Sequence, residues 1–317
     1  PPFGVEREVS LPSLLKEGKY YPGQGLYEDR RVGAALKALE AIPEGERSKE
    51  AFYLMAWCYL LSGDYKKAKE LITQKGLRDA SPWLLAQIYL KEGNCKEALP
   101  YLYNLMNKGR YRREALLEIA RCLFRQGRYK DSMVNLDILQ LEYPDFDRMD
   151  EVLWLRGESL LFLGREKEAA QIYHQIIRQY PHSPRLPSSL YRLMGMALNR
   201  EEMKEAERWR KELLSRFPQH ELSWRACLQM GSEWAQRGRY QQALPLLEIA
   251  SRSPIKEVRE RALFWLGEVY FNLQRLDDAL LAYQRVAEEG KGEWKALAYV
   301  EMGNIHYLQD RYQAATG

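Results

Sequence analysis

The side chains with the widest chemical range in this sequence are its four cysteines and four histidines. The cysteines are Cys58, Cys95, Cys122 and Cys227. They form no C-x-x-C pair, and no histidine lies near them at the spacing of a zinc site. Because unpaired cysteine is among the most buried residue types, we expect four free, buried thiols, which favour a reducing compartment.

The histidines are spread too widely to share one site. We expect His174 on a helix surface, and His182 and His220 in loops. The sequence contains no H-E-x-x-H, G-x-S-x-G or G-x-x-x-x-G-K-[ST] motif. The short runs "GQG" (23–25) and "GKG" (290–292) lack the rest of a phosphate-binding fingerprint and are interpreted as turns. We therefore predict that these residues are not an enzyme and need no cofactor.

Composition excludes further classes of function. The 317 residues are 46% hydrophobic and 29% charged, with a net charge of only +4. Lysine and arginine alternate with aspartate and glutamate, which is a poor electrostatic footprint for nucleic acid. No apolar run approaches the roughly 18 residues of a transmembrane segment. The remaining class of function is binding through the protein surface. The positions of the residues that would carry it depend on the secondary structure.

Regular spacing reveals how that secondary structure is organised. Pro144, Pro181 and Pro218 lie 37 residues apart, and each follows an aromatic residue. A small residue recurs every 30 to 37 residues, at Ala34, Ala68, Ala98, Ser132, Ala169, Ala206, Ala243, Ala279 and Ala315. A second series precedes it, at Ala56, Ala86, Ala120, Gly157, Gly231, Gly267 and Gly303. Fixed periods of this length indicate a repeat architecture.

One repeat shows why these residue types are needed. In 262–286, small residues (Gly267, Ala279) let two antiparallel helices approach, and large ones (Tyr270, Tyr283) fill the space between layers. Between the two helices, runs such as "SGDY", "QGRY" and "RGRY" supply a glycine that ends the first helix in the left-handed conformation. The proline after the second helix forbids its continuation.

This pattern resembles the tetratricopeptide repeat, W-x2-L-G-x2-Y followed by A-x3-F and P, with Leu263 in place of the family's tryptophan. The resemblance covers about residues 32–317. It implies an all-α, right-handed superhelical solenoid of antiparallel helix pairs, with about eight repeats. Residues 1–31 do not fit and are expected to form an irregular N-terminal leader or cap. Because the last repeat is cut off after Ala315, we expect the natural chain to continue. The 37-residue period is also similar to bacterial envelope repeat proteins of the outer-membrane-assembly and Tol-Pal-associated type.

The resemblance also implies a binding surface. In the family, the first helix of each pair lines a concave groove. With the small residue of that helix numbered 8, positions 2, 5, 9 and 12 face the groove. Those we select are Tyr53, Trp83, Arg121, Phe124, Trp154, Glu158, Tyr191, Arg225, Arg261, Phe264 and Asn304. Aromatic residues with interspersed arginine are typical of protein-binding hot spots.

Trp154 and Tyr191 occupy position 5 of adjacent repeats and are expected side by side. An aromatic stripe at helical spacing can equally be core, and for Trp57 and Phe271 both interpretations stay open. In one subgroup, lysine and asparagine at positions 5 and 9 clamp a terminal carboxylate. Here those positions hold Tyr53 and Trp57 in one repeat, so that activity is not expected.

The favoured function is a non-catalytic scaffold that binds a protein or peptide segment in the groove, within envelope assembly. A larger complex or a homo-oligomer is compatible with it, and no nucleic acid is expected. One alternative is a targeting array of an enzyme whose catalytic domain follows residue 317. A less favoured one is RNA binding by helical repeats, because acidic residues fall on the same face. The Tyr-Pro period favours the periplasm or cell envelope, and the thiols favour the cytoplasm.

Overall fold

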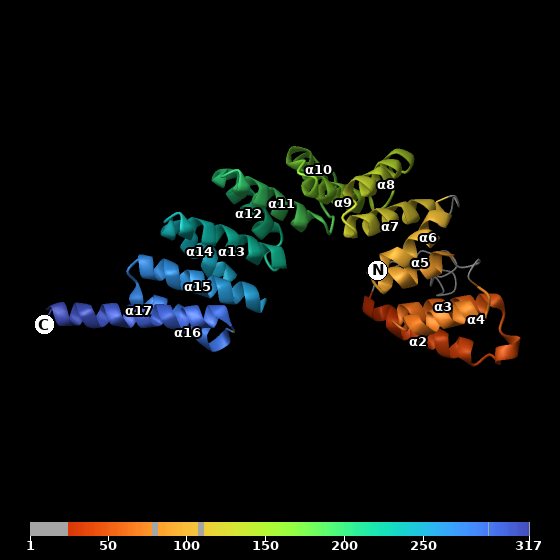
Figure 1. Ribbon diagram of the computed structural model, residues 1–317, viewed down its shortest axis with the longest axis horizontal. Helices are drawn as coiled ribbons and strands as arrows, with labels where there is room; N and C mark the ends of the chain where they lie inside the picture. Colours follow the sequence, from red (N-terminus) through yellow and green to blue (C-terminus); the bar gives the residue numbers. More distant parts are fainter. Residues whose placement is uncertain (1–24, 78–81, 107–110, 291, 317) are drawn as a thin grey trace, which may run out of the picture. The chain divides into compact units, whose positions relative to one another are not determined.

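The computed structural model describes residues 25–77, 82–106, 111–290 and 292–316, with the side chains of 32–310 within those ranges (Figure 1). These residues form 16 α-helices and one short 3-10 helix, without a strand. The predicted all-helical architecture of consecutive helix pairs is confirmed. The chain divides into two compact units, of which unit 1 ends at Leu155 and unit 2 begins at Arg156, inside helix α9 (Met149–Phe162).

Unit 1 contains three helix pairs after its first helix. Its elements are α2 (Gly25–Glu40), η1 (Glu44–Glu46), α3 (Lys49–Leu61), α4 (Tyr65–Gln74), α5 (Pro82–Lys91), α6 (Cys95–Leu105), α7 (Arg112–Arg125), α8 (Tyr129–Glu142) and the first part of α9. Helix α3 packs on α4, α5 on α6 and α7 on α8. Successive pairs are joined through α4 with α5 and α6 with α7.

Unit 2 continues the same arrangement. Its elements are the second part of α9, α10 (Glu166–Gln179), α11 (Leu186–Asn199), α12 (Met203–Arg216), α13 (Glu221–Gln236), α14 (Tyr240–Ala250), α15 (Lys256–Asn272), α16 (Leu276–Glu289) and α17 (Glu293–Thr316). The pairs are α11 with α12, α13 with α14 and α15 with α16. The first helices α11, α13, α15 and α17 also contact one another in that order.

The turn inside each pair is set by one backbone position. Seven residues after the small residue of the first helix, the chain adopts a positive φ, as at Gly63 (82°), Gly127 (74°) and Gly238 (70°). Glycine takes this left-handed conformation without a steric cost, which confirms the predicted helix ends. Two turns lack glycine there, and Glu201 (φ 59°) and Gln274 (φ 61°) take its place.

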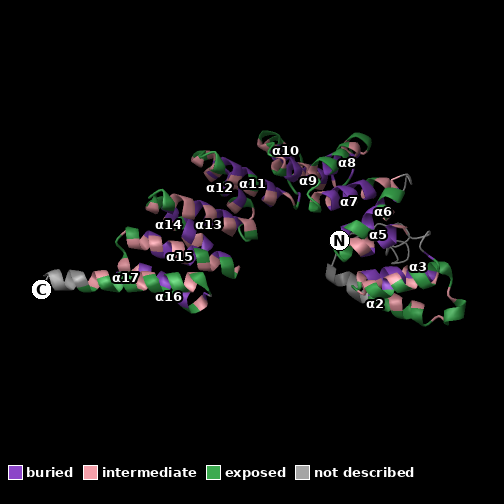
Figure 2. Cartoon of the chain, in the orientation of Figure 1, coloured by how far each residue is buried: buried purple, intermediate pink, exposed green. Residues whose placement is uncertain are grey.

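The contact between paired helices uses the predicted small and large residues. A Cβ placed on Gly267 would lie 2.5 Å from the ring of Tyr283, so only glycine fits beneath that ring. Gly157 and Tyr173 repeat the arrangement in α9 and α10, with a Cβ-to-ring distance of 2.8 Å. Figure 2 shows such buried residues, in purple, along the faces where helices meet. All four cysteines lie in this core as free thiols, and their predicted burial is confirmed.

The two ends of the array differ from the sequence-based expectations. Helix α2 begins at Gly25, within the stretch expected to be an irregular leader, and residues 1–24 lie outside the described part of the chain. At the other end, Ala315 was expected in a second helix, yet 293–316 form one continuous helix. The turn position there is Asp310, which stays helical because no glycine or positive φ interrupts the helix.

Candidate partner-binding site

Most predicted binding residues of unit 1 have partners within the unit. Trp83 is buried, and its ring stacks on Tyr111 with centroids 5.3 Å apart and planes at 10°. Tyr53 is half-buried and meets the ring of Trp57 edge-on at 6.4 Å. Trp57 is itself buried, which favours the core interpretation for that residue. These aromatic side chains therefore contribute to packing within unit 1, and not only to its surface.

Arg121 belongs to a small ionic network in unit 1. Its guanidinium donates to Glu118 at 2.5 Å and to Glu151, while Arg148 donates to Glu151 at 2.9 Å. Burial alone would lower the pKa of Arg121, but the two carboxylates outweigh it and raise that pKa. Because Glu151 comes from α9 and Arg121 from α7, the network ties one repeat to the next.

The other two predicted residues of unit 1 are only partly covered. Phe124 is half-buried and meets Tyr129 edge-on at 5.3 Å. Trp154 is also half-buried, on the part of α9 that belongs to unit 1. Tyr191 lies in unit 2, so its expected position beside Trp154 stays a prediction.

Glu158 is the most buried of the predicted residues, with 3% of its surface exposed. Its Oε1 accepts hydrogen bonds from the Tyr173 hydroxyl (2.6 Å) and the Arg192 Nε (2.9 Å), and its Oε2 accepts one from Arg192 Nη2 (2.5 Å). Burial raises the pKa of Tyr173, and the Glu158 carboxylate raises it further. Glu158 thus links α9, α10 and α11 rather than presenting a carboxylate to solvent.

Three predicted residues of unit 2 come together on consecutive first helices. Tyr191 (α11), Arg225 (α13) and Arg261 (α15) lie close enough for both guanidiniums to act on the tyrosine hydroxyl. Burial raises the pKa of Tyr191, and the positive charges of Arg225, Arg192 and Arg261 oppose that rise. Arg225 is paired with Glu221 on its own helix at 2.7 Å. The charges of these arginines thus act on Tyr191 within unit 2, and a binding line along the first helices stays a prediction.

Phe264 extends this group toward α17. Its ring meets Trp294 edge-on at 5.1 Å and Tyr283 at 5.6 Å. The guanidinium of Arg261 lies over the Trp294 ring, 5.9 Å from its centroid. Asn304 is exposed one helix further and donates to Glu301 at 3.2 Å. We define the arginine–aromatic face as Tyr191, Arg225, Arg261, Phe264 and Trp294.

Trp294 was missed by the sequence analysis because it lies outside the four groove positions. It stands nine residues before Gly303, and Tyr111 stands nine residues before Ala120. Both rings contact the position-5 aromatic of the preceding repeat, Phe264 and Trp83 respectively. The signal that could have found Trp294 is thus an aromatic residue one turn before position 2.

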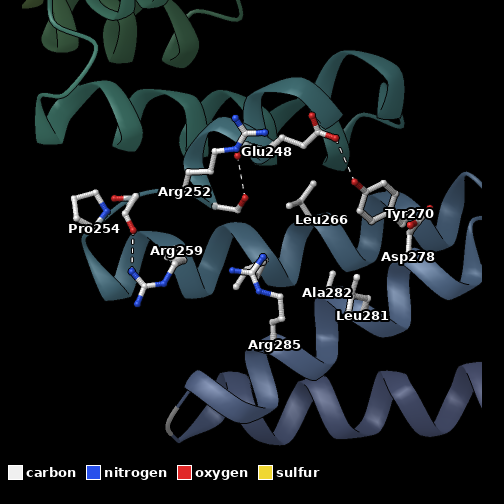
Figure 3. Close-up of a pocket in the computed structure, with 13 residues that line it drawn as sticks. Glu248, Arg252, Pro254, Arg259, Leu266, Tyr270, Asp278, Leu281, Ala282 and Arg285 are labelled. Carbon is white, nitrogen blue, oxygen red and sulfur yellow. Dashed lines mark hydrogen bonds between the residues drawn. The ribbon is translucent and has the colours of Figure 1, made fainter.

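Unit 2 also contains a cavity of about 540 Å³ between the end of α14, α15 and α16 (Figure 3). Its polar groups largely satisfy one another. The hydroxyl of Tyr270 donates to Glu248 at 3.3 Å, and Arg259 donates to the carbonyl of Ser253 at 2.8 Å and to Glu289 at 2.9 Å. Because Arg259 is already paired, it offers little to a charged ligand.

Two further properties bear on function. Within the described residues, no group of three or more histidine, cysteine, aspartate or glutamate side chains is arranged to hold a metal ion. Over the same residues, every helix is too short or too polar to cross a membrane. The arrangement of the arginine–aromatic face suits non-covalent recognition, because it combines flat apolar rings with donors of charge-assisted hydrogen bonds.

Comparison with family models gives the same family as the repeat pattern. Two models described as tetratricopeptide repeat match residues 83–133 and 228–293, and residues 151–183. A third model, described as anaphase-promoting complex, cyclosome, subunit 3, matches residues 28–105. A protein of Treponema pallidum is 32% identical over 80 residues, which are 24% of this chain and 15% of that protein. This chain thus spans only a small part of that relative.

Solved structures show the same fold. A tetratricopeptide repeat protein from Parabacteroides merdae has a TM-score of 0.51 at 17% identity and covers 86% of this chain and 100% of its own. Yeast Tom70 has a TM-score of 0.54 at 12% identity, over 98% of this chain and 67% of its own. BtubC from P. vanneervenii has a TM-score of 0.50 at 12% identity, over 66% of this chain and 91% of its own. With the periodic small residues, the paired helices and these matches in agreement, the chain is a tetratricopeptide repeat protein.

Proposed function

We propose that the chain is a non-catalytic scaffold that binds a partner protein segment on the arginine–aromatic face of unit 2. The observation that carries the proposal is Arg261, which is exposed beside half-buried rings. Its guanidinium lies over the Trp294 ring, and within the described residues it forms no ion pair with a carboxylate. An arginine held over an aromatic ring keeps its hydrogen-bond donors available for a partner carboxylate.

The partner that fits this face is an acidic segment with at least one large apolar side chain. Phe264 and Trp294 supply the apolar contact, and Arg261 supplies the charge. Arg225 forms an ion pair with Glu221, so it would contribute less to partner binding than Arg261. Interface energy concentrates in such aromatic and arginine residues, and surrounding contacts mainly exclude water.

The remaining predicted residues have different proposed roles. Tyr53, Phe124, Trp154 and Asn304 are half-buried or exposed and stay candidates for partner contact. Trp83, Arg121 and Glu158 are proposed to hold neighbouring helices in place, because their polar or ring contacts lie within the array. The first group should affect binding, whereas the second should affect stability.

The test compares variants of one matched set. Partners are captured from a native lysate by chemical cross-linking to the wild-type chain, and the strongest is titrated against each variant. Arg261→Ala and Tyr191→Ala should each weaken binding by about 30-fold, the equivalent of about 2 kcal/mol for a hot-spot residue. Lys204→Ala, which removes an exposed charge from the second helix α12, should bind like the wild type.

Two outcomes would contradict the proposal. If Arg261→Ala and Tyr191→Ala melt at lower temperature but bind the partner normally, these side chains are packing residues. If Lys204→Ala weakens binding as much as Arg261→Ala does, binding depends on net charge and not on this face.

The place of action that we propose is bacterial envelope assembly, and the support for it is the 37-residue Tyr-Pro period. The four free thiols point to the cytoplasm instead. Fractionation of cells that produce the full-length protein decides between the two. Recovery with the periplasmic or membrane fraction supports the envelope, and recovery with soluble cytoplasmic enzymes contradicts it.

A further inference from the structure

A second cavity in unit 2 contains a buried charge that the protein itself balances poorly. The cavity measures about 610 Å³ and lies among second helices α12 and α14 and the end of α13. Arg210 lines it and is 6% exposed. Buried guanidinium groups are normally paired with a carboxylate, because removing the charge from water is costly.

The contacts of Arg210 fall short of such a pair. Its Nη2 lies 4.0 Å from Glu207 Oε1, and its Nη1 lies 4.0 Å from the sulfur of Cys227. Its Nε has no hydrogen-bond partner among the described residues. Glu207 is held more closely by Lys211, at 2.9 Å. A guanidinium can donate five hydrogen bonds, and here most of that capacity is unused.

The rest of the lining is mainly apolar. It consists of Leu214, Trp234, Pro245, Leu246 and Ile249, with Ser215 and Gln242 as neutral polar groups and with Glu207 and Lys211, which pair with each other at 2.9 Å. A volume of this size lies within the range of small-molecule sites, roughly 300–1,000 Å³. A ligand that fits must therefore bring both an anionic group for Arg210 and an apolar body for these side chains.

We propose that this cavity binds a small organic carboxylate with an apolar tail. The carboxylate would accept two parallel hydrogen bonds from the Arg210 guanidinium, the geometry that this pair prefers. The tail would lie against Leu214, Trp234 and Ile249. None of the residues that line this cavity belongs to the arginine–aromatic face, although Trp234 and Arg225 both lie on α13. The proposed site is therefore separate from the proposed partner-binding residues.

The cavity around Tyr270 differs from the Arg210 cavity because its arginine is already paired. There Arg259 already has Glu289 at 2.9 Å and a backbone carbonyl at 2.8 Å. A ligand carboxylate would have to displace those partners, whereas at Arg210 it would replace two contacts at 4.0 Å. The balance of charge therefore selects the Arg210 cavity as the ligand site.

The experiment measures binding of hexanoate, 1-hexanol and acetate to the whole chain by titration calorimetry and thermal melting. Hexanoate should bind the wild type and raise its melting temperature. Acetate lacks the tail and 1-hexanol lacks the charge, so each should bind at least about tenfold more weakly, since a charge-assisted hydrogen bond or a buried apolar tail each exceeds that difference. Equal binding of the three ligands, or no binding of hexanoate, would overturn the proposal.

Two variants test the residues. Arg210→Met keeps the volume but removes the charge, so it should bind hexanoate no better than 1-hexanol. Leu214→Trp fills the apolar part and should lose hexanoate while Arg210 is unchanged. It also keeps the test decisive if Arg210→Met folds poorly. Wild-type affinity for hexanoate in either folded variant would refute the site. Binding of a blocked peptide, acetyl-Leu-Glu-Leu-amide, without binding of hexanoate would refute a free acid as the ligand.

Discussion

Arg261 and Arg210 show two ways in which an arginine of this array escapes a close ion pair. Arg261 is exposed, so water solvates its charge and a partner can approach it. Arg210 is buried, so its charge depends on whatever enters the cavity. By contrast, Arg192 is held by Glu158 at 2.5 Å, and that hydrogen bond raises its pKa. Arg192 is exposed as Arg261 is, so the presence of a close carboxylate, and not solvation or residue type, separates the structural arginine from the two proposed recognition groups.

His174 is the residue whose titration should influence stability. It was expected on the surface, but it is half-buried and its ring lies 5.2 Å from that of Trp209. Burial lowers its pKa, and the positive charges of Arg178 and Arg208 lower it further. The unfolded chain therefore takes up a proton near pH 6.5 before the folded chain does, and the free energy of unfolding should fall as pH drops below about 6.5.

Replacement of His174 tests whether its protonation destabilises the folded chain. His174→Gln should flatten the decrease of unfolding free energy between pH 7 and pH 5.5, measured by urea denaturation. His306→Gln serves as the control because His306 is exposed on α17, and it should leave the decrease unchanged. A steeper decrease in His174→Gln than in the wild type would mean that the folded chain binds the proton more tightly.

At the scale of the helix pair, the turn between first and second helix carries a conformational cost at two places. Glu201 and Gln274 adopt positive φ, where a side chain is unfavourable by roughly 1–2 kcal/mol. Other turns place glycine at the equivalent position, for example Gly238 with φ 70°. The same turn geometry thus occurs both with glycine, which suits it, and with residues that carry a side chain.

This comparison predicts opposite effects for exchanges in the two directions. Glu201→Gly should stabilise the chain by up to about 1 kcal/mol, because the relief of strain exceeds the extra entropy of glycine in the unfolded chain. Gly238→Ala should destabilise it by about 1 kcal/mol, since its Cβ meets no atom within 4 Å and only the backbone is strained. Thermal melting of both variants provides the check. A lower melting temperature for Glu201→Gly would mean that the Glu201 side chain contributes more than its backbone costs.

The pairing of helices could be predicted from the sequence because small and large residues recur at fixed spacing, as Gly267 and Tyr283 do. The continuity of α17 could not, since Asp310 is neither a strong helix former nor a helix breaker. Of the candidate site, the placement of Tyr191 and Arg261 on first helices could be predicted from their repeat positions. The burial of Glu158 does not, because it depends on Arg192 of the next repeat.

At the scale of the whole chain, the helix contacts are local in sequence. In both units, helices pack on their immediate neighbours in the sequence, and in unit 2 the first helices also contact the first helix two elements away. Such an array has no single core, so its stability is a sum over repeats and their interfaces. A substitution in one repeat should therefore change the stability of adjacent repeats, and its effect should decrease with distance along the chain.

Two glycine substitutions on first helices of unit 2 provide the test. In Gly267→Ala, the new Cβ would lie 2.5 Å from the ring of Tyr283, which is buried and donates a hydrogen bond to Glu268 at 2.6 Å. Because that ring cannot easily move, overpacking should cost about 1–3 kcal/mol, against a gain of about 1 kcal/mol in helix propensity. In Gly195→Ala, the Cβ meets no atom within 4 Å, so only the gain remains.

Native-state hydrogen exchange locates these effects along the chain. Gly267→Ala should accelerate amide exchange in α15 and α16, more weakly in α14 and α17, and leave α5 and α6 unchanged, because contacts in the array join only neighbouring helices. Gly195→Ala should slow exchange in α11 and α12. Acceleration that reaches α5 and α6 as strongly as α15 would mean that the two units unfold as one cooperative body, and that the repeats are coupled over a far longer range than their contacts imply.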